Sequence, residues 1–452
     1  MRAHWGSSLG FVLATAGSAI GLGNIWRFPY LIAQNNGGSF LLIYLLCIIL
    51  LGYFLLTSKL AFGRIAQTNF LDGFQKVAPK QISPLWKQIG GSIIILNIFL
   101  VCSIYAIVIG WTLSYVFVAG QNLFSTNIAV NQELFQSLTD SYHKQFFWGL
   151  LCILISSLVL IKGVKGGIEK AALYLMPVLF GLLIFMAFRI FLLPNTEKGF
   201  SYLFQINWNA LGFDTDGFHP HQLAHITLLA LGQAIYSLSL GLGVCFIYGS
   251  YLKPDLDIKR AGLWIVFLDT CVALLASCII VPAVFSFGLD INQGPGLSFV
   301  TLPFAFEQVK GGRFLMFLFF VSLFVAALTS LISIYEPLIN LITEKLNWKR
   351  KRATFCVAGI NVFTSMIILA SFTKKVNLKV IGRDLFDWID YITGAYTLGL
   401  AVLLFCLFMG WEIAPQIVEN LKIKNKFWAK YIVFVLKWLA PITLVVLFFT
   451  AW

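Results

Sequence analysis

The stretch TAGSAIGLGNIWRFPY, residues Thr15 to Tyr30, lies in the first apolar segment of the chain. It contains three glycines, an asparagine, an arginine and a proline, most of which a continuous membrane-spanning helix would avoid. Inside a membrane, an interrupted helix is tolerated only where its free backbone groups line a cavity or contact other protein groups. The stretch therefore predicts a first span that is broken at residues 17–24 and carries a charge, Arg27, near its end.

The composition is typical of a membrane protein with many spans. Of the 452 residues, 59% are apolar and 11% are charged, and a soluble protein of this size could not bury so much apolar surface. No cleavable signal peptide is expected, because residues 1–5 lead directly into an apolar segment. The eight cysteines include no C-x-x-C pair, so neither a metal site nor a disulfide framework is predicted.

Eleven predicted spans account for the basic surplus of the chain. They cover approximately residues 9–30, 38–63, 88–118, 146–161, 168–193, 222–250, 261–287, 313–342, 353–372, 386–411 and 429–450. With the N-terminus in the cytoplasm, most lysines and arginines fall in cytoplasmic segments, and the C-terminus lies outside. The net charge of +13 is therefore a topology signal for the cytoplasmic membrane and needs no nucleic-acid partner. Residues 295–312 are too short to span and predict a loop with a short helix against the outer surface.

A second interrupted span gives the chain an internal symmetry. The sixth span contains SLSLGLG, residues 237–243, about 220 residues after the first break. Within a single transmembrane domain, 1–452, two halves are predicted at 9–193 and 222–411, with 429–450 left over. Close packing of small residues explains either break alone, but matched breaks with polar neighbours are typical of inverted-repeat transporters.

Broken helices at membrane depth have a defined chemistry. The N-terminus of a half-helix attracts a carboxylate, and unpaired carbonyls with hydroxyls suit a hard cation such as Na⁺. The eighth span adds two adjacent hydroxyls, Thr329 and Ser330, within AALTSLISIYEP. Such hydroxyls can also bond the carbonyl one turn earlier in their own helix, so on their own they do not establish an ion site.

Five segments resemble one family of transporters. GSAIGLGNIWRFPY in the first span, GQAIYSLSLGLGV in the sixth and AALTS in the eighth are similar to signatures of the neurotransmitter:sodium symporters. GWTLSYVF and KGGIEKAALYLMPVLF resemble the third and fifth helices of that family. The resemblance implies an all-α polytopic membrane protein with a LeuT-type fold: a 5+5 inverted repeat, discontinuous helices 1 and 6, and an additional eleventh span. It also implies Na⁺-coupled uptake of amino acids or related amines by alternating access, and no enzymatic activity.

The resemblance implies two sodium sites and one substrate site. The first sodium site would use Ala19, Asn24, Ser237 and the substrate carboxylate. The second would use Gly17, Ile20, Ala326, Thr329 and Ser330. The substrate site would comprise Ser18, Ala19, Leu22, Gly23, Val101, Tyr105, Tyr236, Ser239, Leu242, Ser330 and Ile334. Tyr105 and Tyr236 would close over the substrate, and the alternative for Tyr105 is an aromatic packing residue with a bonded hydroxyl.

Two gates are implied in the same way. Arg27 and Asp390 match the outer gate, with Asp387 as a competing partner and interfacial snorkelling as an alternative role for Arg27. The inner gate would be formed by Arg2, Trp5 and Glu344. Opening one gate while the other closes would complete the transport cycle.

Two charges inside spans raise further questions. Asp269, in the seventh span, is a functional-site candidate because a carboxylate at membrane depth is costly. We predict that it belongs to the first sodium site, either as a ligand or just behind the ligands, and that it replaces chloride. Protonation of Asp269 on the empty return is a further possibility. Lys59 stands in the second span where the family usually has glutamate, and it either snorkels to the inner surface or pairs with the buried Glu336.

The predicted substrate is a neutral L-amino acid. Leu242 stands where relatives often have an aromatic residue, so its pocket with Ile334 leaves room for a large hydrophobic or aromatic side chain. An acidic substrate is disfavoured because no free cation is placed in the pocket. A non-transporting sensor and an ion channel remain alternatives, whereas the five histidines show no catalytic spacing such as H-E-x-x-H. Two sodium ions are expected, chloride is not, and the oligomeric state is open, with a homodimer among the alternatives.

Overall fold

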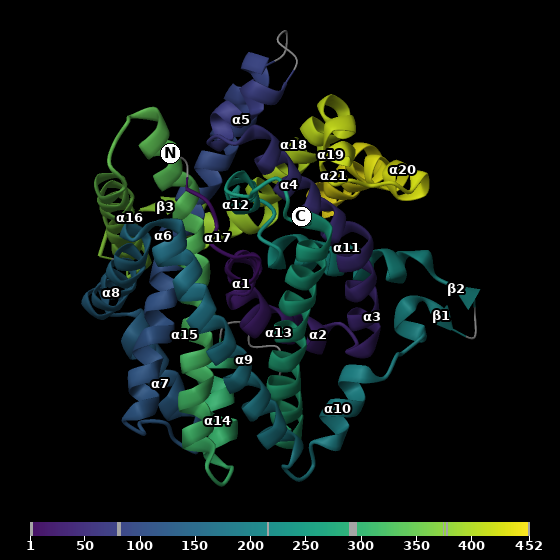
Figure 1. The fold of residues 1–452 in the computed structure, drawn as a ribbon. Helices are drawn as coiled ribbons and strands as arrows, with labels where there is room; N and C mark the ends of the chain where they lie inside the picture. Colours follow the sequence, from purple (N-terminus) through teal and green to yellow (C-terminus); the bar gives the residue numbers. More distant parts are fainter. Residues whose placement is uncertain are drawn as a thin grey trace.

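The fold is a bundle of helices with two short hairpins (Figure 1). The computed structural model describes residues 3–78, 83–214, 217–288, 296–373, 375–376 and 378–450. One hairpin pairs β1 (Phe213–Asp214) with β2 (Gly217–Phe218) in antiparallel register, Phe213 opposite Phe218. The other pairs β3 (Lys379–Val380) with β4 (Arg383–Asp384), Lys379 opposite Asp384.

The helices of the first half contain short π-helical turns, labelled η. In chain order they are α1 (Ser8–Ala19), η1 (Gly23–Arg27), α2 (Phe28–Gln34), α3 (Gly38–Cys47), η2 (Ile48–Gly52), α4 (Tyr53–Ala66), α5 (Phe70–Val77), α6 (Ser83–Gly120), α7 (Ile128–Thr139), α8 (Tyr142–Ile161), η3 (Val164–Glu169) and α9 (Lys170–Phe191).

The helices of the second half follow a connection made of α10 (Glu197–Phe204), the 3₁₀ turn η4 (Asn209–Leu211) and the first hairpin. In chain order they are α11 (Pro220–Ser237), α12 (Val244–Ser250), α13 (Ile258–Ser286), η5 (Leu297–Thr301), α14 (Leu302–Glu307), α15 (Gly312–Lys345), α16 (Arg350–Phe372), α17 (Leu385–Ile392), η6 (Thr393–Thr397), α18 (Leu398–Leu407), η7 (Phe408–Glu412), α19 (Ala414–Asn420), α20 (Lys426–Phe434), η8 (Val435–Leu439) and α21 (Ala440–Thr450). The short η5–α14 segment confirms the predicted helix within residues 295–312.

Ten of the eleven predicted spans are found. Within the described ranges, eight helices are long and apolar enough to cross a membrane, and two bent pairs raise the number to ten. The predicted sixth span corresponds to the interrupted pair α11 and α12, which is not among these ten, so the count of eleven remains a prediction. The division into two repeats remains a prediction.

The first break lies where the sequence predicted it. α1 ends at Ala19, and the helix that begins at Gly23 is bent from it by 56°. Ser7 caps the start of α1, because its hydroxyl accepts a hydrogen bond from the amide of Gly10. Within the break, a Cβ on Gly21 would lie 2.7 Å from the hydroxyl of Ser330 on α15. Glycine at position 21 therefore lets the unwound segment between α1 and η1 approach α15 closely.

The second break also matches its prediction. α11 ends at Ser237 and α12 begins at Val244. Between them, Ser239 and Gly243 have φ angles of +50° and +69°. Gly243 adopts this left-handed conformation without strain, whereas Ser239 does so at a cost of order 1–3 kcal/mol. The strained backbone is held by the surrounding structure at the point where a site was predicted.

α15 is the central helix of the bundle. Inside the protein, 83% of its spanning segment is buried, against 28% for the span that contains α9. α15 packs against α1, α6, α9 and α16 (Figure 1). α9 carries large apolar side chains that are exposed, among them Val178, Ile184 and Phe188, as a lipid-facing helix does. The two breaks therefore lie beside the most buried helix.

Candidate functional site

The two broken helices meet at one cavity of about 780 Å³. α6, α15 and the start of the tenth span complete its wall, and α21 contributes Leu444, Leu447 and Phe448. Every predicted substrate residue lines it: Ser18, Ala19, Leu22, Gly23, Val101, Tyr105, Tyr236, Ser239, Leu242, Ser330 and Ile334. These residues come from segments more than 300 positions apart in the chain, and the fold brings them to one place. Their binding roles remain predictions.

Two buried hydroxyls beside this cavity form no well-aligned hydrogen bond with the described residues. They are the Oγ of Ser18 and the Oη of Tyr105. A Cβ on Gly21 would lie 3.1 Å from the Tyr105 oxygen, so this hydroxyl is directed at the break in the first helix. A buried hydroxyl without a partner costs about 1–3 kcal/mol, and a bound carboxylate would satisfy it.

The predicted first ion site contains a compact cluster of buried polar groups. The side-chain amide of Asn24 donates to Ser237 Oγ at 3.0 Å and to Asp269 Oδ1 at 2.8 Å. The hydroxyl of Ser237 donates to Asp269 Oδ2 at 2.7 Å. All three side chains are almost fully buried, and none of the ion pairs in the described ranges involves Asp269. A buried carboxylate without a cationic side chain is costly, so this cluster suits a bound cation.

The predicted second ion site lies where α1 meets α15. The hydroxyl of Ser330 donates to the carbonyl of Ile20 at 3.0 Å and is 3.4 Å from that of Gly17. Thr329 donates to the carbonyl of Ala326 at 2.9 Å. The back-bonding expected of an isolated threonine is therefore present, together with a grouping of oxygens from two helices. Hydroxyl and carbonyl oxygens grouped in this way suit a hard cation such as Na⁺.

The predicted outer-gate residues lie at the mouth of the same cavity. Arg27 and Asp390 both line it, and Asp387 does not. The guanidinium carbon of Arg27 lies 4.7 Å from the ring centroid of Tyr236, and this placement is a cation–π contact. Arg27 and Asp390 form no direct ion pair, although both lie in the described ranges. Asp390, and not Asp387, therefore lies where the acid of the outer gate was predicted.

The opposite end is closed around the predicted inner gate. The indole nitrogen of Trp5 donates to the carbonyl of Tyr248 at 3.0 Å, and the Trp5 side chain is buried. Glu344 accepts bonds from the backbone and side-chain nitrogens of Asn69 at 2.8 and 3.0 Å. Arg2 lies outside the described residues, so its pairing with Glu344 remains a prediction.

Comparison with known proteins decides the family. A model described as "Sodium:neurotransmitter symporter family" matches residues 2–137 and 132–452. The chain belongs to this family. It is therefore a sodium-dependent transporter and not an enzyme, as the sequence predicted.

Similar proteins support this assignment over the full length of the symporter. It is 30% identical to an uncharacterized sodium-dependent transporter of Haemophilus influenzae, over 99% of this chain and 97% of the relative. It is 36% identical to the uncharacterized sodium-dependent transporter YhdH of Bacillus subtilis, over 91% and 88% of the two chains. Among solved structures, MhsT in complex with L-phenylalanine is similar with a TM-score of 0.88 and 33% identity over both whole chains. The predicted LeuT-type fold is confirmed.

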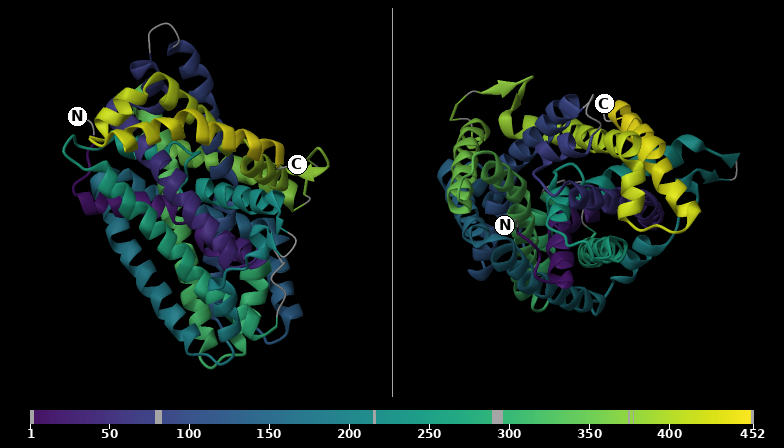
Figure 2. Two further views of the ribbon diagram at one scale, coloured as in Figure 1. Left: turned by 90° about the vertical axis from the view of Figure 1, so that its right-hand side faces the viewer. Right: turned by 45° about the horizontal axis from the view of Figure 1, so that its top comes forward.

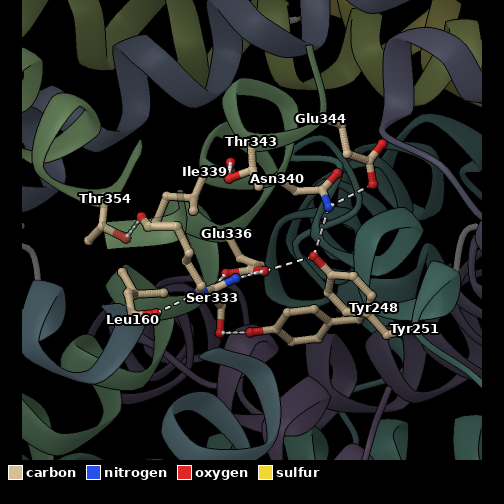
Figure 3. Close-up of polar contacts among 11 residues, drawn as sticks. Leu160, Tyr248, Tyr251, Ser333, Glu336, Ile339, Asn340, Thr343, Glu344 and Thr354 are labelled. Atoms are coloured by element: carbon tan, nitrogen blue, oxygen red, sulfur yellow. Dashed lines mark hydrogen bonds and ion pairs between the residues drawn. The ribbon is translucent and has the colours of Figure 1, made fainter. Parts of the chain in front are cut away.

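One predicted pair in the symporter is wrong. Glu336 does not pair with Lys59 but with Arg350 at the start of α16. The two guanidinium nitrogens of Arg350 contact the two carboxylate oxygens of Glu336 at 3.0 and 2.5 Å. Tyr251 donates to the same carboxylate at 2.8 Å, and Asn340 donates to the Tyr251 hydroxyl (Figure 3). The sequence does not reveal this network, because Arg350 belongs to a basic run, residues 349–352, which indicates the topology and singles out no residue that turns inward.

Lys59 contacts an uncharged backbone group instead of Glu336. It is 1% exposed, and its ammonium group donates to the carbonyl of Leu240 in the break between α11 and α12. It also lies 4.0 Å from the ring centroid of Phe405. The prediction that Lys59 snorkels to the surface is therefore wrong as well. Its hydrogen bond instead stabilises the unwound segment between α11 and α12.

Lys59→Met is expected to destabilise the transporter by about 1–3 kcal/mol, because the buried Leu240 carbonyl loses its donor. The measurement is thermal unfolding of the purified protein in detergent, with Lys375→Met as the matched control. Lys375 also lies over an aromatic ring, that of Tyr142, but it is exposed, so its loss should cost less. Equal stability of Lys59→Met and the parent would show that the Leu240 contact is dispensable.

Proposed function

We propose that this symporter imports a neutral, hydrophobic or aromatic L-amino acid across the cytoplasmic membrane, driven by two sodium ions. The observation that carries the proposal is the division of the central cavity. One part has the broken helix ends and the Tyr105 hydroxyl, which suit an amino-acid carboxylate. The other part is lined by Val101, Leu242 and Ile334, which suit an apolar side chain.

The charges around the cavity favour a neutral substrate. Of the described residues that line the cavity, one is a lysine or arginine, namely Arg27. It lies at the mouth of the cavity, over the ring of Tyr236. A substrate with a second carboxylate would have no cation deep in the cavity to neutralise it, and burying an unpaired charge is costly. The relative MhsT was solved with L-phenylalanine, which is consistent with this preference.

Coupling would follow from shared ligands. In the proposed arrangement, the carboxylate of the substrate joins Asn24 and the Ala19 carbonyl around the first ion. Ion and substrate then increase each other's affinity by the same factor, as linkage requires. Asp269 beside this ion would supply the negative charge that chloride supplies elsewhere, so uptake should be equal in chloride and gluconate.

Transport would proceed by alternating access with the N-terminus in the cytoplasm, as the distribution of basic residues favours. The cavity reaches Arg27 and Asp390 at its mouth, while the buried Trp5 and the Glu336–Arg350 pair seal the opposite end. Import requires the mouth to close over the substrate and that seal to open.

A competition assay tests the substrate class. Purified protein is incubated with labelled L-phenylalanine in Na⁺ or in choline, and unlabelled amino acids are added as competitors. We expect Na⁺-dependent binding that is displaced by large neutral L-amino acids and not by glutamate, lysine or D-phenylalanine. Binding that ignores Na⁺, or displacement by glutamate, would contradict the proposal.

Tyr105→Phe is expected to weaken substrate affinity at least about tenfold. Phenylalanine keeps the ring packing but removes the hydroxyl, and a hydrogen bond to a charged group contributes about 1.5–3 kcal/mol. The same binding assay measures the loss. Tyr115→Phe is the matched control, since Tyr115 is a buried tyrosine of the same helix that does not line the cavity, and its hydroxyl also has no hydrogen-bond partner within the described part of the chain. If both variants bind alike, Tyr105 does not contact the carboxylate.

A further inference from the structure

A second hollow, separate from the transport cavity, lies between α19 and the last span. We name it the α19–α20 groove, with a volume of about 800 Å³ and walls formed by residues of α19, the following turn and α20–η8. The two helices are in contact and lie at the end of the bundle that also carries α5 and the N-terminus (Figures 1 and 2). In the proposed orientation this end faces the cytoplasm.

The groove concentrates positive charge. Four of its lining residues are lysines: Lys422, Lys424, Lys430 and Lys437. One carboxylate, that of Glu419, lines it as well. None of the ion pairs in the described ranges involves any of these lysines. Their ammonium groups are therefore available to an anion from outside the chain.

The floor of the groove is apolar. Pro415, Val418, Ile423 and Val433 line it between the lysines. A small inorganic anion would neutralise the lysines but leave this floor exposed to water. A ligand with both an anionic group and a hydrocarbon part would cover both surfaces at once.

The surroundings place the groove at the depth of lipid headgroups. The helix that contains α18 and η7 is bent by 88° from α19, so α19 turns away from the direction of the tenth span. Two exposed tryptophans, Trp411 and Trp438, lie beside it with ring centroids 5.2 Å apart, and Lys437 lies over the Trp411 ring. Exposed tryptophans at the ends of spans are typical of the membrane–water interface.

We propose that the α19–α20 groove binds one anionic phospholipid of the cytoplasmic leaflet. The phosphate lies among the lysines, and the upper part of an acyl chain covers Val418 and Val433. Basic pockets between transmembrane helices on the cytoplasmic side are a recognised setting for such lipids. Topology alone would require lysines on this side, but it would not require four of them around one apolar-floored groove.

The site is connected to two other spans of the bundle, α4 and α13. The guanidinium group of Arg64 on α4 donates to the side-chain oxygen of Asn420 at 2.9 Å and to its carbonyl at 2.6 Å. Lys259 at the start of α13 donates to the carbonyl of Lys422 at 3.2 Å. A lipid bound here would therefore stabilise the position of α19 against α4 and α13.

Native mass spectrometry of the detergent-solubilised protein tests the proposal by counting bound lipid. Phosphatidylglycerol, phosphatidylcholine and inorganic phosphate are titrated separately. We expect one phosphatidylglycerol to bind with higher affinity than any phosphatidylcholine, and inorganic phosphate not to displace it. In the double variant Lys424→Gln/Lys430→Gln, the affinity should fall about 25-fold, from roughly a fivefold effect per lysine near an anionic lipid.

The matched control is Lys349→Gln/Lys351→Gln, which removes the same charge from exposed lysines of the predicted cytoplasmic surface outside the groove. It should bind phosphatidylglycerol like the parent. Equal losses in both double variants, equal binding of phosphatidylcholine, or displacement by inorganic phosphate would each overturn the proposal. If the groove double variant does not fold, two other measurements decide the question. One is the comparison of lipids on the parent, and the other is the affinity of the two single variants for phosphatidylglycerol, which should fall about fivefold in each. None of these readouts requires transport, so their failure is distinct from failure of the proposed function.

Discussion

Asp269→Asn is expected to reduce the apparent affinity for Na⁺ by at least about 100-fold. The carboxylate accepts bonds from Asn24 and Ser237 at 2.8 and 2.7 Å and would supply the charge that offsets the bound ion. A hydrogen bond to a charged group contributes about 1.5–3 kcal/mol and one to a neutral group about 0.5–1.5 kcal/mol, so losing one bond and weakening the other amounts to about 3 kcal/mol. Asparagine has nearly the same shape, but its amide nitrogen would face one of these donors.

The measurement is the Na⁺ concentration that gives half-maximal binding of labelled L-phenylalanine. Asp257→Asn is the matched control, because Asp257 caps the same helix in solvent and asparagine is an equally good cap. It should behave like the parent. An unchanged Na⁺ dependence in Asp269→Asn would remove Asp269 from the ion site, and a chloride requirement of the parent would refute its role as a fixed substitute for chloride.

Arg350→Met is expected to lower the stability of the protein by about 3–5 kcal/mol. Glu336 is fully buried, and its two oxygens contact Arg350 at 3.0 and 2.5 Å. Removing one partner of a buried ion pair leaves the other charge uncompensated in a poorly solvated place. Thermal unfolding of the purified protein in detergent measures the change.

A partly exposed ion pair is the comparison that separates burial from charge. Lys87 lies 3.7 Å from Asp72, and these two side chains are 33% and 31% exposed, so Lys87→Met should leave the stability close to that of the parent. The double variant Glu336→Met/Arg350→Met should recover much of the loss, since no lone charge remains. A Glu336–Arg350 pair that costs no more to break than the Lys87–Asp72 pair would show that the network in Figure 3 does not hold the inner end together.

The two helix breaks could be predicted because they depend on residue types that are close together in the sequence. Gly17 to Asn24 and Ser237 to Gly243 interrupt long apolar segments, and membrane helices can be interrupted only in a few settings. The resemblance to a known family then assigned residues far apart in the chain to one site, and the cavity contains all of the predicted substrate residues. This part of the prediction depended on residue types that few other folds require.

The partners of buried charges could not be predicted in the same way. Lys59, Glu336 and Arg350 lie on three different helices, and the rotation of each helix decides which side chains meet. Nothing in the run of residues 349–352 distinguishes Arg350, which turns inward, from the two lysines and Arg352, which are exposed. The α19–α20 groove could not be predicted either, because it depends on a bend of 88° between η7 and α19. Gly410 and Pro415 flank this bend, but they do not determine its angle.

The central claim is that a Na⁺ gradient drives an amino acid through the cavity between the two broken helices. Uptake of labelled L-phenylalanine into proteoliposomes, with Na⁺ outside and K⁺ inside, tests it most directly. We predict accumulation above the external concentration, which disappears when an ionophore dissipates the gradient and is reduced in Asp269→Asn. Na⁺-dependent binding without accumulation would contradict transport and indicate a sensor. Equilibration without accumulation, at any gradient, would instead indicate a channel.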